Sequence, residues 1–128
     1  MLNTDTPQFR MNLLINLQKV NNAIDYIASA SKSFTDSKDT NTIIRMNLNI
    51  RGEAFRKHTM ALVDGKLSFH MQEVTLRQLR DTAVQIYQSI YKMQEALETD
   101  PEFSFDEQTM AHLNAHRFTI GCIAKHYS

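Results

Sequence analysis

The chain has 128 residues, which is enough for one domain with a single hydrophobic core. Its 14 lysines and arginines balance its 14 aspartates and glutamates, so the formal net charge is zero. This balance argues against a general nucleic-acid coat or an anionic-membrane binder, because both depend on excess positive charge.

The cysteine content and the apolar runs indicate the cellular setting. The single cysteine, Cys122, cannot form an internal disulfide, which favours a reducing compartment. The first residues lack the charged start and apolar run of a signal peptide, and no apolar stretch approaches the ~20 residues that span a bilayer. We therefore predict a cytoplasmic protein that does not associate with a membrane.

The first predicted element is a long helix over residues 7–33, after a loose N-terminus at residues 1–5. Thr6 and Pro7 fit the N-cap and the first helical position. Apolar residues then repeat at alternating four- and three-residue spacing, which is one face of a helix. They are Leu13, Leu17, Val20, Ile24 and Ile27.

Three further apolar residues of this helix, Met11, Ile15 and Tyr26, fall on the opposite side. A helix that is apolar on two sides has a second face to cover. We interpret these residues as a face that contacts a partner protein or a second copy of the chain.

A strand is predicted over residues 43–51, where apolar and polar residues alternate without interruption. Gly52 marks a turn or bulge after it. A second strand over residues 55–63 then leads into a hairpin.

The hairpin is the most sharply specified element of the sequence. Asp64 and Gly65 stand between two apolar-alternating runs, and a type I′ hairpin turn needs positive φ at both of its central positions. The third strand is predicted over residues 66–72. In this register one face of the hairpin collects five apolar side chains. They are Met60, Leu62, Leu67, Phe69 and Met71.

Two more helices are predicted, over residues 76–98 and 105–125. Thr75 and Gln78 fit a capping box at the start of the first, and Pro101 stops it. The whole chain is therefore predicted to be one α+β domain in the order helix, three-stranded antiparallel meander, helix, helix. The long helices would pack on one face of the sheet.

The exposed face of the predicted sheet carries basic and amide side chains. They are Arg45, Asn47, Asn49 and Arg51 of the first strand, with Lys66 and His70 of the hairpin. Such a face suits phosphate contacts, with asparagines available for base edges. The helix–three strands–helix order is similar to that of double-stranded-RNA-binding domains, although their basic cluster at the start of the second helix is missing. Nucleic-acid binding through this face is our alternative function.

Two histidines are weak metal-ligand candidates. His112 and His116 stand four residues apart on a predicted helix, a spacing at which two imidazoles can share one ion. No third ligand occurs at a matching position nearby, so we predict no metal and no cofactor.

Arg51 and His58 are separated by six residues, a spacing similar to the Arg–x(4–6)–His motif of the HEPN-family ribonucleases. Those proteins are helical bundles with both residues on one helix. The predicted strands and Gly52 place the two residues on different elements here, so the resemblance is limited to the motif.

No set of catalytic residues is evident. The chain has no Gly-rich phosphate loop, no nucleophile elbow and no cysteine with a pattern-matched histidine. We therefore expect a non-enzymatic regulatory module, of the adaptor or inhibitor type, that docks to another protein. A homodimer is compatible with this expectation.

Overall fold

The protein is described by a computed structural model that covers residues 6–30, 38–99 and 107–128, with side chains from residue 45 onward in the second segment. In these ranges the chain forms four helices and no strand. They are α1 (Pro7–Ala30), α2 (Lys38–Asp64), α3 (Phe69–Thr99) and α4 (Glu107–His126). The predicted α+β fold with a three-stranded meander is therefore wrong.

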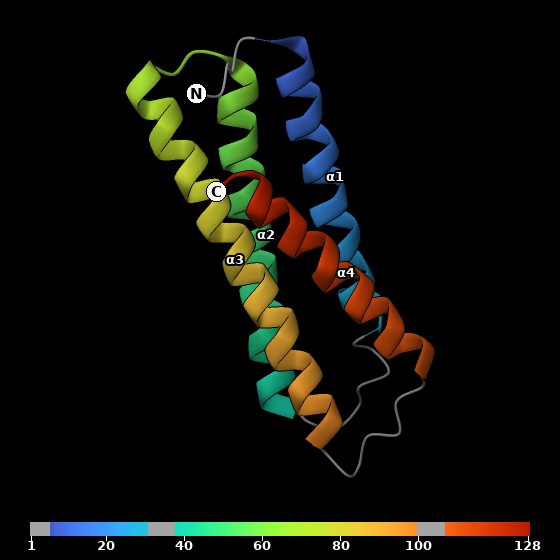
Figure 1. Ribbon diagram of the computed structural model, residues 1–128. Helices are drawn as coiled ribbons and strands as arrows, with labels where there is room; N and C mark the ends of the chain where they lie inside the picture. The colour runs from blue at the N-terminus through green and yellow to red at the C-terminus, as the bar shows by residue number, and fades with distance from the viewer. Residues whose placement is uncertain (1–5, 31–37, 100–106) are drawn as a thin grey trace.

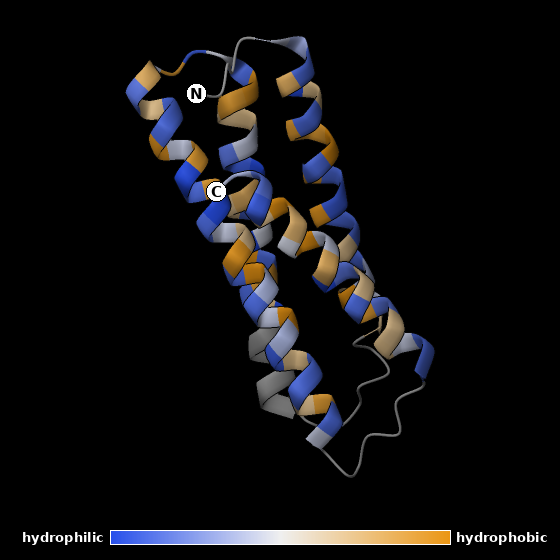
Figure 2. Cartoon of the chain, viewed as in Figure 1, coloured by the Kyte–Doolittle hydropathy of each residue, from blue (hydrophilic) through white to orange (hydrophobic). Residues whose placement is uncertain are grey.

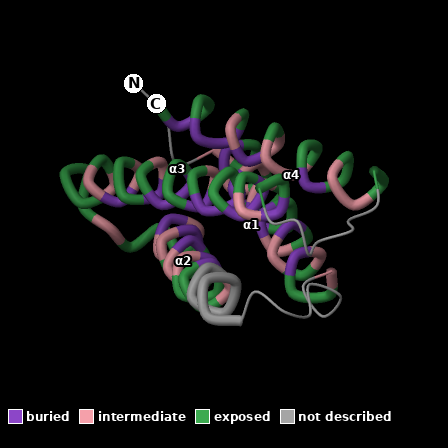
Figure 3. The backbone as a smooth tube through the Cα atoms, turned by 90° about the horizontal axis from the view of Figure 1, so that it is seen from below, coloured by how far each residue is buried: buried purple, intermediate pink, exposed green. Residues whose placement is uncertain are grey.

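The helices run alternately down and up and form an antiparallel four-helix bundle (Figure 1). Each helix packs against the next one in the chain, and α4 closes the ring by packing, less extensively, on α1. Apolar and polar residues alternate around each helix (Figure 2), and the buried sides face the bundle interior (Figure 3). The buried apolar residues of all four helices form one continuous core.

The strand predicted over residues 43–51 is part of α2, because a helical stripe outweighs the local alternation. The buried residues of α2 follow a four-three-four-three spacing: Leu48, Gly52, Phe55, Thr59 and Leu62. Two of these five are glycine and threonine, so an apolar count does not reveal the stripe. Met46 and Ile50, which supported the strand prediction, are exposed on α2.

Gly52 is needed where α1 approaches α2. A Cβ atom at this position would overlap Cδ1 of Ile24 on α1. Glycine is therefore explained by the close approach of two helices and not by a turn or bulge.

The predicted hairpin is also wrong, although its glycine does adopt positive φ. Gly65 has φ of 72° and ends α2, with its N–H donating to the carbonyl of Leu62 at 3.3 Å. Ser68 then caps α3, since its hydroxyl accepts the N–H of Met71 at 3.2 Å. The predicted strand over residues 55–63 lies within α2, and the predicted strand over residues 66–72 is the end of the α2–α3 turn followed by the first residues of α3.

The helix predicted to begin at residue 76 begins seven residues earlier, at Phe69. Thr75 lies inside α3, and its hydroxyl donates to the carbonyl of Met71 at 2.7 Å instead of capping the helix.

The start of α1 agrees with its sequence signals. The N–H of Phe9 donates to the Thr6 hydroxyl at 3.1 Å, which is an N-cap bond directly before Pro7. The predicted N-terminus at residues 1–5, and the predicted helix ends at 31–33 and 105–106, lie outside the described residues. None of the four described helices combines the length and apolarity that a bilayer crossing requires.

Candidate functional site

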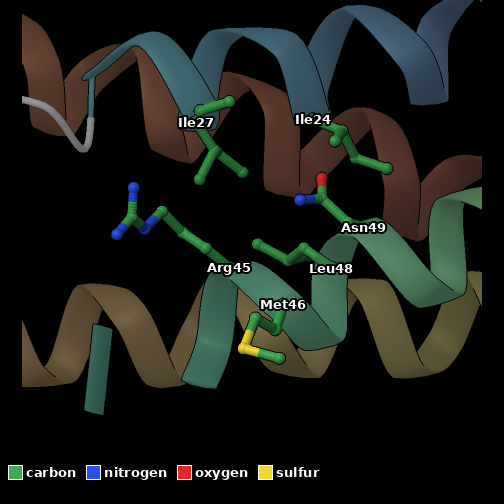
Figure 4. Close-up of a pocket in the computed structure, with 7 residues that line it drawn as sticks. Ile24, Ile27, Arg45, Met46, Leu48 and Asn49 are labelled. Atoms are coloured by element: carbon green, nitrogen blue, oxygen red, sulfur yellow. The ribbon is translucent and has the colours of Figure 1, made fainter. Parts of the chain in front are cut away.

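The residues of the predicted basic sheet face do not form one surface, because successive residues of a helix are turned by about 100°. Arg45 and Asn49 face α1 and line a cavity of about 250 Å³ together with Ile24 and Ile27 (Figure 4). Arg51 lies on another side of α2, where its Nη1 donates to the Ser89 hydroxyl of α3 at 2.9 Å.

The remaining members of that set are dispersed as well. Asn47 is exposed on α2, and Lys66 and His70 are exposed around the α2–α3 connection. The helical rise places the end of α2 about 20 Å from Arg51. Because the residues are dispersed in this way, the predicted nucleic-acid face does not exist as a single surface.

Arg51 and His58 lie on one helix, in contrast to the sequence prediction. Seven positions separate them along α2, so they project from similar sides two turns apart. Partial burial lowers the pKa of the His58 imidazole below its ordinary value. The prediction that Arg51 and His58 lie on different elements is therefore wrong, because both lie on one helix.

His112 and His116 make aromatic contacts across the α1–α4 interface. Their ring centroids lie 5.2 and 5.1 Å from the ring of Tyr26 on α1. Burial, and to a smaller extent the neighbouring His112, lowers the pKa of His116. Within the part of the chain that is described, no group of three potential metal-ligating side chains comes together.

A groove separates α1 from α4 above this aromatic contact, and we call it the α1–α4 groove. Ile15, Asn16 and Lys19 line it from α1, and Phe118 and Cys122 line it from α4. The groove has a volume of about 470 Å³. It is open to solvent and holds apolar and amide side chains side by side.

A buried polar contact fixes the inner side of the groove. The Asn16 amide Nδ2 donates to the Tyr127 hydroxyl at 2.9 Å, which links α1 to the C-terminal end of α4. Burial raises the pKa of Tyr127, and the bond from Asn16 opposes that change. The hydroxyl therefore stays protonated at neutral pH while it accepts the amide proton.

Exposed apolar side chains surround the α1–α4 groove. Met11 is 60% exposed and Ile15, one turn further along α1, is 45% exposed. Phe118 of α4 is 73% exposed. Of the three residues predicted as a partner face, the structure thus brings Met11 and Ile15 to the surface together and places Tyr26 against the two histidines.

Charge is unevenly distributed around this groove. Residues 8–24 of α1 and 108–128 of α4 contain no acidic residue. They contain four fully charged bases, which are Arg10, Lys19, Arg117 and Lys125. Lys19 is the member of this set that lines the α1–α4 groove, which therefore carries a cation and no acid; a count of charges along the two segments would have revealed the lack of acids.

The chain matches no family model, and no curated protein or solved structure resembles it significantly.

Proposed function

We propose that this protein is a non-enzymatic docking module, of the adaptor or inhibitor type, that binds a partner protein in the α1–α4 groove. One observation carries the proposal: Ile15 on α1 and Phe118 on α4 expose apolar surface in the two walls of one groove, with Met11 exposed one turn before Ile15. Contiguous exposed apolar surface beside a concavity is typical of protein-binding sites.

The chemistry of the groove favours an amphipathic helix with acidic flanks as the bound segment. α1 and α4 form the two walls of the groove, and a helix bound between them would place apolar side chains in it every three or four residues. Lys19 and His126 are the ionisable groups that line the groove with Cys122, and no acid stands among them. Carboxylates on the partner would complement this charge.

A second copy of the chain fits the same surface less well. A two-fold axis near Leu14 would run α1 antiparallel to its copy and bring Arg10 of one chain near Lys19 of the other. Residues 8–24 offer no acid to balance these cations. Like charges in an isologous interface oppose association, so we assign the groove to a different protein.

Selection from a displayed library of random peptides tests the proposal. Peptides of about 16 residues would supply ~24 Å of helix. We expect selected peptides to share apolar residues at helical spacing with Asp or Glu beside them. Met11→Gln with Ile15→Gln should weaken their binding by roughly tenfold or more, since both side chains belong to the contact.

The matched control is Met46→Gln with Ile50→Gln, which removes an equally exposed apolar pair from α2. This variant should bind the selected peptides as tightly as the unsubstituted protein does. An equal loss of peptide affinity in the α1 and α2 variants would contradict the proposal. Selection of peptides with basic instead of acidic residues would contradict it as well. A dimer in sedimentation that only the α1 variant dissociates would assign the groove to a second copy.

A second candidate function is RNA cleavage at Arg51 and His58, and one observation favours it. Both residues lie on α2 of a helical bundle, at a spacing similar to the motif of the HEPN-family ribonucleases. The lowered pKa of His58 leaves its imidazole neutral at pH 7, as a general base requires, while a guanidinium suits a phosphate.

Cleavage of a labelled RNA mixture by the purified protein tests this candidate. Arg51→Ala and His58→Ala should each abolish cleavage, whereas Lys57→Ala, an exposed substitution between them, should leave it unchanged. Cleavage that persists in both variants, or no cleavage by the unsubstituted protein, would eliminate the candidate. Urea unfolding of each variant separates loss of chemistry from loss of the fold.

A further inference from the structure

The other side of α4 carries a separate arrangement of aromatic and basic side chains, which we call the α3–α4 aromatic face. Tyr87 and Tyr91 stand one turn apart on α3, and the guanidinium carbon of Arg117 lies 5.8 and 5.2 Å from their ring centroids. Arg117 therefore joins α4 to α3 through two cation–π contacts.

The tyrosine nearest α4 is held against that helix by a glycine. A Cβ atom at Gly121 would lie 3.2 Å from Cε2 of Tyr87, so the absence of a side chain lets the ring pack against the helix. The ring of Tyr87 is partly buried in this position. The face is thus built on a fixed aromatic residue and not on mobile surface side chains.

Two aromatic rings beside this fixed residue remain open to solvent. Tyr91 is 46% exposed on α3, and Phe118 is 73% exposed on α4. Two shallow pockets, of about 440 and 430 Å³, adjoin along Tyr87. One pocket is also lined by Tyr91 and Lys92, and the other by Arg117, Phe118 and Lys125.

The charge on this face is positive. Residues 82–94 of α3 and 108–128 of α4 contain no acidic residue. Lys92, Arg117 and Lys125 line the two pockets. Asp81 precedes this segment of α3 and Glu95 and Glu98 follow it, and the proximity of Glu95 raises the pKa of the Tyr91 hydroxyl.

We propose that the α3–α4 aromatic face binds single-stranded nucleic acid, whose bases stack on Tyr91 and Phe118 while its phosphates contact Lys92, Arg117 and Lys125. A single strand presents planar rings and negative charges alternately along its length, which matches two open aromatic rings separated by cations. A duplex hides the faces of its bases, and an acidic peptide has no regular series of planar groups. This face shares Phe118 with the α1–α4 groove, but its second open ring and its cations come from α3 and α4, whereas the α1 wall of the groove is aliphatic and amide.

Fluorescence anisotropy with labelled oligonucleotides of about 10 nucleotides, a length within the usual site size, tests this inference. We expect binding to both DNA and RNA single strands that weakens as salt is raised, because phosphate contacts release counterions. Phe118→Ala and Tyr91→Leu should each reduce affinity by roughly 5- to 150-fold through the loss of one stacked base. Arg117→Gln should reduce both the affinity and its dependence on salt.

Three further measurements separate stacking from attraction between charges alone. Phe118→Trp should restore the affinity that Phe118→Ala loses, since it returns an aromatic surface. Lys57→Gln, which removes an exposed cation from α2, should have little effect. Inorganic polyphosphate, which has charge but no bases, should compete poorly.

Several outcomes would overturn the inference. They are absence of binding at low salt, unchanged affinity in Phe118→Ala, and equal affinity for duplexes of the same length. Met11→Gln with Ile15→Gln should leave oligonucleotide binding intact, so this experiment and the test of the docking function fail or succeed separately.

Discussion

The two interfaces on opposite sides of the bundle are built differently. The α2–α3 interface follows a short connection, is the most extensive helix pair of the bundle and is crossed by the Arg51–Ser89 bond, while α2 contributes buried Leu48, Phe55 and Leu62 to the common core. The α1–α4 interface relies on Tyr26 with two histidines and on the Asn16–Tyr127 bond, and it leaves a groove. The comparison indicates that the α2–α3 interface contributes more packing to the stability of the fold, whereas the α1–α4 interface leaves apolar surface open to solvent.

The largest expected effect is on the α2–α3 side. Phe55 is fully buried, so Phe55→Ala leaves a cavity and should lower the free energy of unfolding by about 3–5 kcal/mol. Phe118→Ala, which removes an equally large but exposed ring, should change it by less than about 0.5 kcal/mol. Urea unfolding followed by circular dichroism measures both. Similar decreases in the free energy of unfolding of Phe55→Ala and Phe118→Ala would contradict this prediction.

A smaller effect is expected from the polar contact on the α1–α4 side. Tyr127→Phe removes the hydroxyl that accepts the Asn16 amide proton and should cost about 0.5–1.5 kcal/mol in urea unfolding. The control is Tyr91→Phe, which removes the hydroxyl of an exposed tyrosine and should cost almost nothing. If Tyr127→Phe lowered the free energy of unfolding as much as Phe55→Ala does, the two interfaces would contribute comparably to stability.

The smallest effect is a dependence of stability on pH. In the folded protein, burial and the neighbouring His112 lower the pKa of His116 below its ordinary value of 6.5. Between the folded-state pKa and 6.5, the unfolded chain therefore binds more protons at this histidine than the folded protein does. The free energy of unfolding should be constant above that interval and decrease within it. His58, whose pKa is lowered by burial, acts in the same direction on α2.

Unfolding midpoints at pH 7.5 and 5.5 measure this dependence. His116→Gln should reduce the difference between the two midpoints, and His58→Gln should reduce it independently. His70→Gln, at an exposed site, should leave the difference unchanged. An unfolding midpoint that rises from pH 7.5 to pH 5.5 would contradict the lowered pKa values of His116 and His58.

The sequence predicted α1 well and α2 badly, for physical reasons that differ. The start of α1 is specified locally, by the Thr6 hydroxyl and by Pro7. Gly65 needs positive φ, as predicted, but this requirement is common to a hairpin turn and to the end of a helix. Which of the two forms depends on whether Leu48 and Phe55 find partners on other helices, and a local pattern does not contain that information.

The candidate site was predictable only in part. Met11 and Ile15 were recognised because they lie outside the apolar stripe of α1. Phe118 was not, because the apolar residues of α4 surround the helix and only packing decides which of them stay exposed. The absence of acids from residues 108–128 was available from the sequence, and it is the signal that would have directed attention to α4.

The closure of the ring by α4 has a consequence for the order of folding. Every other packed pair of helices is consecutive in the chain, whereas Asn16 and Tyr127 are 111 residues apart. Bringing such distant segments together costs the most chain entropy, so helix pairs joined by short turns form early and contact between the two ends comes late. The docking of α4 is then the last step to form and the first to open, and hydrogen exchange in this helix should report that opening at a lower free energy than global unfolding. A ligand that bridges α1 and α4 would hold the first and last helices together, and a ligand that bridges α3 and α4 would likewise oppose the opening of α4, so either should slow unfolding.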